Sequence, residues 1–359
     1  MNSFSRNLIR IQELETLLKE EHSKQDEIDL LTELAWELRI NQPKRAAQLA
    51  RQAHTLSESE DKSYLNGVAA SLVTLAFTYL QAGKLQDGTK ICLEALKYVK
   101  DHPPTTTIAR IWYTLAENSF FIRNFPLALT LAEKAQELAR ELGMEVETAL
   151  ATDTIASSWG ILGKFDKAIS THTEAIAMFQ DQDEIYGWLR ARNNLAMTLY
   201  GKGEHEKAQA EIQNVLNDAK KHNSKYDLLN IYCTAAQIAI DLDQLDEAEQ
   251  YLDAAFRNAE VLENMITYHV YVMMEWARLS LKRNEPQKAR SHLLQAIVVA
   301  EENDQLFELV QCYEMLADIA EKDGDLEKAK GYRDDHKFHR EILEKKLHEY
   351  QSSIEDATT

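Results

Sequence analysis

Hydrophobic and small residues recur along this chain in a pattern whose period is about 40 residues. Each period centres on a small residue that closely follows a turn. These anchor residues are Ala46, Gly88, Ala128, Ala168, Ala208, Ala248, Ala289 and Ala329. Because the spacing hardly varies, one supersecondary unit is repeated with almost no insertion or deletion. Such a pattern predicts a solenoid, in which each repeat packs on its neighbours.

Two further small positions accompany most anchors and indicate how each repeat folds. One lies twelve residues before the anchor, at Ala76, Ala116, Ala156, Ala196, Ala236, Ala277 and Ala317. The other lies seven residues after it, at Ala53, Ala95, Ala135, Ala175, Ala255 and Ala296. Two helices approach closely only where their facing side chains are small, so the pattern predicts a tightly packed antiparallel helix hairpin in each repeat.

The two helices of a repeat are separated by a short turn. Gly83, Asn124 and Gly163 stand where a first helix ends, and we expect each to adopt the left-handed conformation that closes the last carbonyls. A large apolar residue such as Phe125 follows and seals the end of the hairpin. Pro126 then falls in the first turn of the second helix, where its missing N–H costs least.

Composition supports an all-α fold. Apolar residues make up 45% of the chain, which is enough for a continuous core, and 11 Gly and 5 Pro among 359 residues leave long helices uninterrupted. A repeat array grows without splitting into globular domains, so we expect one solenoid domain of about eight hairpins over residues 23–335.

Both ends of the chain are predicted to differ from the repeats. Residues 1–22 are expected to form an N-terminal capping helix, whose apolar face carries Ile11 and Leu14. Residues 336–359 are expected to extend the last helix and to end in a frayed polar tail. This extension is either a cap that buries the final hairpin or a short coiled-coil spacer. The cap is favoured, because the heptad pattern is short and the tail is polar.

The repeated segments resemble the tetratricopeptide repeat family. The segment 191–216, ARNNLAMTLYGKGEHEKAQAEIQNVL, carries the small residue of the first helix, the Gly-containing turn and the alanines of the second helix. The standard period is about 34 residues, and the longer helices here are similar to those of the subclass in kinesin light chains, spindle adaptors and bacterial sensor modules. The resemblance implies a right-handed α-solenoid that binds a protein or peptide in a concave groove.

The resemblance also implies which residues of the first helices face that groove. They are Arg110, Tyr113, Glu117, Asp153, Ser157, Arg190, Asn193, Asn194, Met197, Asn230, Gln237 and Arg278. Amides both donate to and accept from a peptide backbone, and an arginine can hold a carboxylate with two hydrogen bonds. Arg190 with its neighbours Asn193 and Asn194 is the foremost candidate. The alternative is that these polar side chains serve only their own hairpin or its neighbours.

Charge narrows the choice of partner. The chain has 40 basic and 59 acidic residues, a formal net charge of -19, which disfavours nucleic acid and anionic membranes. The negative electrostatic field of the chain would attract a basic or amphipathic partner. The alternative is that the acidic excess serves only to keep the protein soluble. Three cysteines without a CxxC pair favour a reducing, cytoplasmic location. We find no signal peptide and no apolar run long enough to cross a membrane.

Motifs for catalysis are absent from the sequence, which lacks phosphate-binding, dinucleotide-binding, HExxH and GxSxG patterns. His336 and His339 could share a metal with Asp335, but a solvated helix face explains them better, so no metal or cofactor is predicted. We therefore expect a non-enzymatic scaffold that binds a protein or peptide. The alternative is a regulatory sensor of a bacterial signalling system, which couples the binding of a peptide or small ligand to an effector protein.

Overall fold

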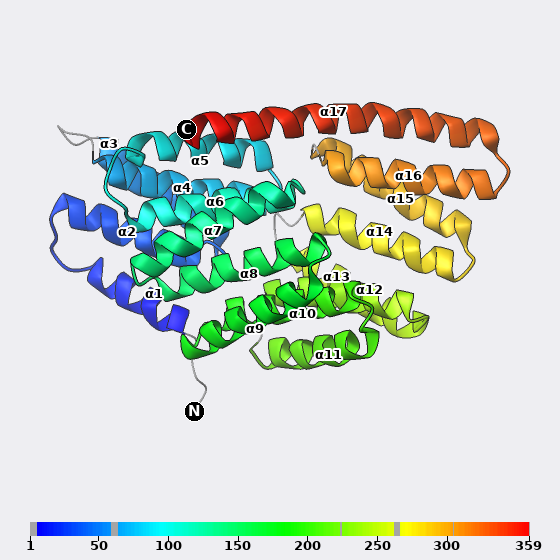
Figure 1. Ribbon diagram of the computed structural model, residues 1–359, viewed down its shortest axis with the longest axis horizontal. Helices are drawn as coiled ribbons and strands as arrows, with labels where there is room; N and C mark the ends of the chain where they lie inside the picture. The colour runs from blue at the N-terminus through cyan, green and yellow to red at the C-terminus, as the bar shows by residue number, and fades with distance from the viewer. Residues whose placement is uncertain (1–5, 59–63, 223–224, 262–265, 304, 359) are drawn as a thin grey trace. The chain divides into compact units, whose positions relative to one another are not determined.

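The computed structural model describes residues 6–58, 64–222, 225–261, 266–303 and 305–358. Over these ranges the chain forms 17 α-helices, joined mainly by short turns (Figure 1). The first is α1 (Arg6–Leu17), and the other sixteen alternate as the first and second helices of eight repeats. Packing between the two helices of a repeat is seen for α2 with α3, α4 with α5, α6 with α7, α8 with α9, α12 with α13 and α14 with α15. The prediction of an all-α repeat of helix hairpins is therefore confirmed for the described part of the chain.

Each hairpin has a first helix and a second helix. The first helices are α2 (Lys24–Leu38), α4 (Leu65–Gln81), α6 (Thr106–Phe121), α8 (Glu145–Ile161), α10 (Ile185–Gly201), α12 (Lys225–Asp241), α14 (Ile266–Lys282) and α16 (Leu306–Lys322). The second helices are α3 (Pro43–Glu58), α5 (Leu85–Val99), α7 (Phe125–Glu141), α9 (Phe165–Asp181), α11 (His205–His222), α13 (Leu245–Val261), α15 (Pro286–Glu302) and α17 (Leu326–Thr358).

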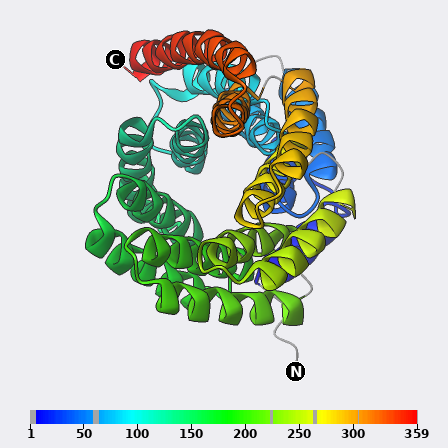
Figure 2. The same cartoon turned by 90° about the vertical axis from the view of Figure 1, so that its right-hand side faces the viewer.

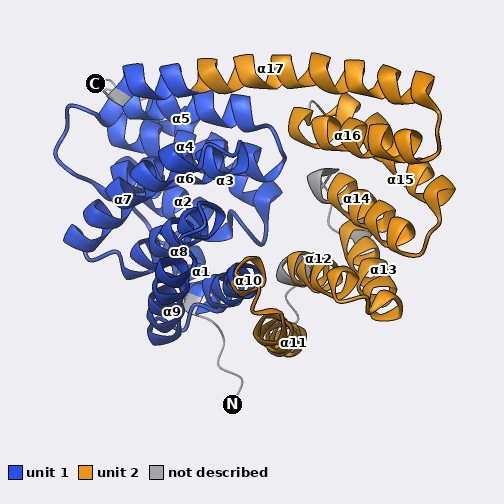
Figure 3. Cartoon of the chain, turned by 45° about the vertical axis from the view of Figure 1, so that its right-hand side comes forward, with its two compact units in different colours: residues 1–198, 351–359 blue, residues 199–350 orange. Residues whose placement is uncertain are grey.

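The helices group into two compact units (Figure 3). Unit 1 comprises residues 1–198 together with residues 351–359, and unit 2 comprises residues 199–350. In unit 1, α2 packs on α4, α4 on α6 and α6 on α8, so the first helices contact one another as well as their own partners. In unit 2, α12 packs in the same way on α14, and α14 on α16. Figure 2 shows the helices from a second direction, coloured by residue number.

The small residues lie where the helices approach most closely. Ala128, Ala168 and Ala208 have no exposed surface, and neither do Ala116 and Ala156 on the facing helices. At Gly88 a methyl group would lie 3.0 Å from the carbonyl oxygen of Ala76, so this anchor has no room for a larger side chain. The packing role predicted for the small residues is confirmed.

The turns differ from the prediction at one position. Gly83 and Gly163 have positive φ, as expected, but in the third hairpin Arg123 adopts φ 63°, and Asn124 does not. Asn124 instead caps helix α7, where its side chain accepts a hydrogen bond from the N–H of Leu127. The physical reason is that an Asn side chain satisfies a free N–H at the start of a helix, and the left-handed residue precedes that cap.

The last helix continues past the final repeat, as expected, because α17 runs without a break from Leu326 to Thr358. The tail that was expected to fray is helical up to Thr358, where Ile354 is only 1% exposed and Asn124 donates a hydrogen bond to Gln351. Burial of an apolar side chain keeps this polar segment helical.

At the other end of the chain, α1 packs on α2. Ile11 and Leu14 of α1 join a core cluster with Leu34 and Leu38 of α2. Residues 1–5 of the expected capping segment lie outside the described residues.

Candidate functional site

The twelve residues predicted to face a groove lie on first helices, nine of them in unit 1 and three in unit 2. In unit 1 they come from α6, α8 and α10, and most of them contact one another or a neighbouring repeat. Their arrangement is set by the repeat, because each first helix presents the same face to the next one. Two arginines, Arg110 and Arg190, are the centres of this arrangement.

Arg110 of α6 lies between two carboxylates from different repeats. Its Nη1 and Nη2 donate to the Oε1 and Oε2 of Glu33 on α2, at 2.5 and 2.9 Å. Its Nε and Nη2 donate to Glu147 Oε1 on α8, at 3.2 and 3.1 Å. The Arg110 side chain is 9% exposed, and its guanidinium lies 4.9 Å from the centre of the Trp36 ring. This ion-pair group ties three first helices together.

Arg190 of α10 forms a second group. Its Nη1 and Nη2 donate to both oxygens of Glu117 on α6, at 2.9 and 3.2 Å, and its Nε donates to Asp153 Oδ2 on α8 at 2.9 Å. It also donates to the hydroxyls of Tyr113 and Thr154. The side chain of Asp153 has no exposed surface, and that of Glu117 is 8% exposed. Arg190 therefore supplies the positive charge that these two buried carboxylates require.

Asp153 contacts more partner residues than the other acids of this group. His172 Nδ1 of α9 lies 2.9 Å from its Oδ1, and Asn194 Nδ2 donates to its Oδ2 at 3.0 Å. Burial raises the pKa of Asp153, but the His172 contact and the Arg190 guanidinium outweigh that effect and hold the pKa below its usual value. Asp153 is therefore a carboxylate at neutral pH, and it fixes the positions of Arg190 and Asn194.

The remaining predicted residues of unit 1 are partly accessible or lack partners. Ser157 of α8 and Met197 of α10 are half-buried. The hydroxyl of Ser157 and the side-chain oxygen Oδ1 of Asn193 are buried atoms without a hydrogen-bond partner among the described residues. Buried polar atoms without partners are uncommon in folded proteins. These two atoms therefore have unused hydrogen-bonding capacity next to a fixed network.

Unit 2 repeats the scheme on a smaller scale. Arg278 of α14 donates to both oxygens of Asp241 on α12 at 3.0 Å, and to Glu275 at 2.8 Å. The amide oxygen of Gln237 accepts a hydrogen bond from the Tyr271 hydroxyl at 3.1 Å. Asn230 of α12 is half-buried. Each of the three predicted residues of unit 2 thus lies on a first helix, and two of them are hydrogen-bonded to another first helix.

Sequence reasoning missed the acids and the imidazole that complete the unit 1 groups, Glu33, Glu147 and His172. A signal for one of the three nevertheless exists in the sequence. Oppositely charged residues that pair on successive first helices are 37 positions apart, as in Arg110 with Glu147, Asp153 with Arg190, and Asp241 with Arg278. A search at this separation would have found Glu147, but not Glu33, which is 77 positions from Arg110, or His172, which is 19 positions from Asp153.

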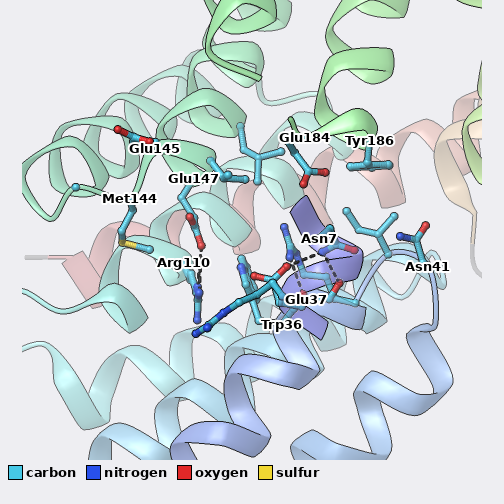
Figure 4. Close-up of a pocket in the computed structure, with 16 residues that line it drawn as sticks. Asn7, Trp36, Glu37, Asn41, Arg110, Met144, Glu145, Glu147, Glu184 and Tyr186 are labelled. Carbon is cyan, nitrogen blue, oxygen red and sulfur yellow. Dashed lines mark hydrogen bonds and ion pairs between the residues drawn. The ribbon is translucent and has the colours of Figure 1, made fainter. Parts of the chain in front are cut away.

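A cavity of about 210 Å³ lies in unit 1 beside the Arg110 group (Figure 4). It is lined by Asn7 and Arg10 of α1, by the C-terminal end of α2, and by the N-terminal ends of α8 and α10. Glu37 and Arg39 lie on its α2 side, and Glu184 and Tyr186 on its α10 side. Figure 4 shows Asn7 beside Glu37, where its amide donates to the carboxylate at 2.5 Å. The cavity is not part of the predicted site, and only Arg110 belongs to both.

Among the described residues, no group of three or more His, Cys, Asp or Glu side chains is placed to hold a metal ion. Nor is any helix of that part of the chain long and apolar enough to span a bilayer. The ring of His339 instead stacks on Tyr313, with 5.3 Å between ring centres.

Comparison with known sequences identifies one repeat of the chain. The tetratricopeptide repeat family model matches residues 229–260, which lie in the hairpin of α12 and α13. No curated protein matches the chain in sequence.

Solved structures extend the likeness to nearly the whole chain. A Rap protein complexed with competence and sporulation factor is 14% identical, with a TM-score of 0.69 over 95% of this chain and 92% of that one. The Rap conjugation gene regulator of plasmid pLS20, in complex with the Phr* peptide, is 13% identical, with a TM-score of 0.64 over 94% and 96%. Aspartyl phosphate phosphatase F from Bacillus subtilis is 15% identical, with a TM-score of 0.56 over 95% and 96%.

At these identities the likeness concerns the fold. The family model thus matches one tetratricopeptide repeat, and the similar solved structures show that nearly the whole chain shares the fold of repeated helix hairpins.

Proposed function

We propose that this protein binds an extended peptide, either free or as a segment of a partner protein, along the first helices α6, α8 and α10 of unit 1. The observation that carries the proposal is the network around Asp153, which holds Arg190 and Asn194 in place beside buried polar atoms of Ser157 and Asn193 that lack partners. Polar groups that are fixed before binding lose little entropy when a ligand arrives.

The kind of group available suits a peptide backbone. Asn194 and Asn193 carry amides, and Ser157 carries a hydroxyl, and both groups donate and accept hydrogen bonds. Arg190 already uses its donors on Glu117 and Asp153, so its role in this proposal is to position the site rather than to hold a ligand carboxylate. Asn194 is the residue that we expect to contact the peptide.

The similar structures support the same kind of ligand. One of them is a complex with the Phr* peptide, and another is a complex with competence and sporulation factor. The net charge of -19 on this chain favours a basic or amphipathic peptide. We propose that the protein acts in the cytoplasm by binding alone, without a cofactor.

A second candidate is a regulatory sensor, in which the peptide changes how the protein engages an effector. One of the similar structures is described as a gene regulator in complex with a peptide, which favours this candidate over a passive scaffold. A sensor needs two conformations with different affinities for the peptide. Small-angle scattering of the full chain with and without a bound peptide tests this candidate, and an unchanged scattering curve contradicts it.

Peptide binding is tested with a library of free hexapeptides. The full chain is incubated with the mixture, bound peptides are recovered by size exclusion and identified by mass spectrometry, and the Kd of the best one is measured by calorimetry. Asn194→Ala is expected to weaken binding by about tenfold, because one peptide hydrogen bond in a partly buried site is lost. Asp153 retains His172 and Arg190 in this variant, so the fold is maintained.

The matched control is Asn217→Ala, since Asn217 is an exposed asparagine on the second helix α11. Its peptide affinity should equal that of the wild type. If the library yields no bound peptide, or if the two variants bind equally well, the proposed site is wrong. Measuring acetyl phosphate hydrolysis in the same samples tests the rival activity that the similarity to a phosphatase raises.

A further inference from the structure

The cavity of unit 1 contains an arginine that differs from the other arginines around it. Arg110 is held by Glu33 and Glu147, and Arg10 lies 3.4 Å from Glu13. Arg39 is 6% exposed and makes no direct ion pair among the described residues, although its charge acts at longer range on Glu37 and Glu184 and lowers the pKa of each against the larger effect of burial. A buried guanidinium without a direct ion pair is costly and therefore uncommon.

The contacts of Arg39 leave most of its hydrogen-bonding capacity unused. Its Nη1 donates to the carbonyl oxygen of Trp36 at 2.6 Å, which closes the end of α2, and its guanidinium lies 3.9 Å from the centre of the Trp36 ring. A guanidinium has five N–H donors. The Arg39 Nε is buried and has no partner. The hydrogen bond to Trp36 at the end of α2 therefore uses one N–H donor of Arg39. The other N–H groups of the guanidinium remain available to bind an anion.

Two acids that line the same cavity lack a direct ion pair with a cation, just as Arg39 lacks one with a carboxylate. Glu37 accepts hydrogen bonds from the amide of Asn7, and Glu184 accepts from the backbone N–H groups of Gly187 and Tyr186, but neither has a cation within ion-pair distance among the described residues. Burial raises the pKa of Glu37, and it raises the pKa of Glu184 to about 7. Arg39 offsets this effect only at a distance, so both acids would gain from a positive charge in direct contact.

The cavity is small. Its volume of about 210 Å³ lies below the roughly 300–1,000 Å³ of pockets that hold drug-sized ligands. A ligand that gives Arg39 an anion and gives Glu37 and Glu184 a cation must therefore carry a negative and a positive group within a few bonds of each other. A free α-amino acid has this chemistry, with a carboxylate and an ammonium group on one carbon atom.

We propose that this cavity binds a free amino acid, whose carboxylate meets the guanidinium of Arg39 and whose ammonium group meets Glu37 and Glu184. The site lies apart from the Asn194 face proposed for peptide binding, so a small ligand and a peptide would be sensed by different residues of unit 1. The side chain of the amino acid would lie toward Met144, Val146 and Leu150, the apolar residues of the α8 side.

The test uses the full-length chain and the twenty common L-amino acids, each assayed separately by saturation-transfer NMR and then by calorimetry. At least one is expected to bind. For the best one, the C-terminal amide lacks the carboxylate, and the N-acetyl derivative lacks the ammonium group. Each should bind about tenfold more weakly or worse, because each loses a charge-assisted contact.

Two variants assign the contacts. Arg39→Met should weaken binding of the free amino acid by about tenfold or more, while Arg140→Met, an exposed arginine on α7, should leave it unchanged. Glu184→Gln should weaken binding of the free amino acid but not of its N-acetyl derivative.

The proposal is overturned if none of the twenty amino acids binds at millimolar concentration, or if the amide and the N-acetyl derivative bind as well as the parent. Equal affinities for Arg39→Met and Arg140→Met would also overturn it. Should Arg39→Met fail to fold, the comparison of the three ligands on the wild-type chain decides. Peptide capture is measured separately, so failure here leaves the peptide proposal standing.

Discussion

At the scale of single residues, the notable feature is how charges are buried. Arg110 and Arg190 each lie between two carboxylates that come from other repeats. An exposed ion pair contributes little to stability, whereas a buried charge that loses its partner is strongly destabilising. These two arginines therefore act as links between hairpins whose hydrophobic contacts are otherwise made mainly with nearest neighbours.

Replacing Arg190 by methionine should lower the free energy of unfolding by roughly 3–5 kcal/mol, because Glu117 and Asp153 would stay buried without their cation. Urea denaturation followed by circular dichroism measures the change. The matched control is Arg140→Met, whose exposed partner Glu174 lies 3.9 Å away. The control should change the free energy by at most about 0.5 kcal/mol. A similar loss of unfolding free energy in both variants would show that the buried network stabilises the fold no more than an exposed ion pair does.

Glu184 should make stability depend on pH. Burial raises its pKa from 4.5 to about 7 in the folded chain, so between these values the folded state keeps a proton that the unfolded state has lost. The stability that this group provides is complete below pH 4.5, declines as the pH rises and is lost above pH 7. Glu184→Gln removes this titration, and its amide oxygen can still accept the backbone N–H groups of α10.

We therefore expect Glu184→Gln to be more stable than the wild type at pH 8, by roughly 2 kcal/mol, with the difference shrinking toward pH 5. Urea denaturation at a series of pH values measures it. Glu145→Gln, an exposed neighbour on the same cavity, is the control and should follow the wild-type profile. A difference that is constant across the pH range would rule out the titration of Glu184 as its cause.

At the scale of helices, much of the fold follows from the sequence. The anchors and the small residues of the facing helices repeat at fixed spacing, and they predicted the hairpins because only small side chains allow such close approach. The C-terminal end was harder to predict. The segment 351–358 has few apolar residues, and no repeat pattern reveals that Ile354 has a core to enter.

Burial of Ile354 predicts that the end of α17 contributes to stability. Ile354→Ala should lower the free energy of unfolding by about 2–4 kcal/mol, since a fully buried isoleucine would leave a void. Phe338→Ala on the same helix removes a larger side chain that is 60% exposed, and it should have little effect. Thermal or urea denaturation of both variants measures the difference. Equal stabilities would mean that the helix end does not pack in solution.

The candidate site was predictable only in part, for a reason that also concerns helices. A helical repeat tells which positions share a face, so it correctly grouped Arg110, Asp153 and Arg190 on first helices. It does not tell which of them pair, since pairing depends on the offset between neighbouring helices. The cavity could not be predicted, because it is formed by the ends of α1, α2, α8 and α10, where the repeat pattern stops.

At the scale of the whole molecule, the excess of acidic residues should govern the response to salt. With a net charge of -19, repulsion among surface carboxylates opposes folding. Raising sodium chloride from about 0.02 to 0.3 M shortens the Debye length to well below 10 Å and screens that repulsion. Buried pairs such as Arg190 with Asp153 are screened much less.

The melting temperature is therefore expected to rise by a few degrees over this range of salt, as measured by differential scanning calorimetry. Sodium and choline chloride should act alike if screening is the cause. A fall in melting temperature would mean that the exposed ion pairs, such as Arg283 with Asp246, stabilise the chain more than the net charge destabilises it.

The grouping of residues 351–359 with unit 1 has a consequence for biosynthesis. The rest of unit 1 lies before residue 199, so a ribosome must translate all of unit 2 before it makes the segment that carries Ile354. During that interval the surface that will receive Ile354 is uncovered on the nascent chain. Unit 1 therefore completes its folding last, although its first helices are made first, and a chaperone that shields apolar surface would be needed most during that delay.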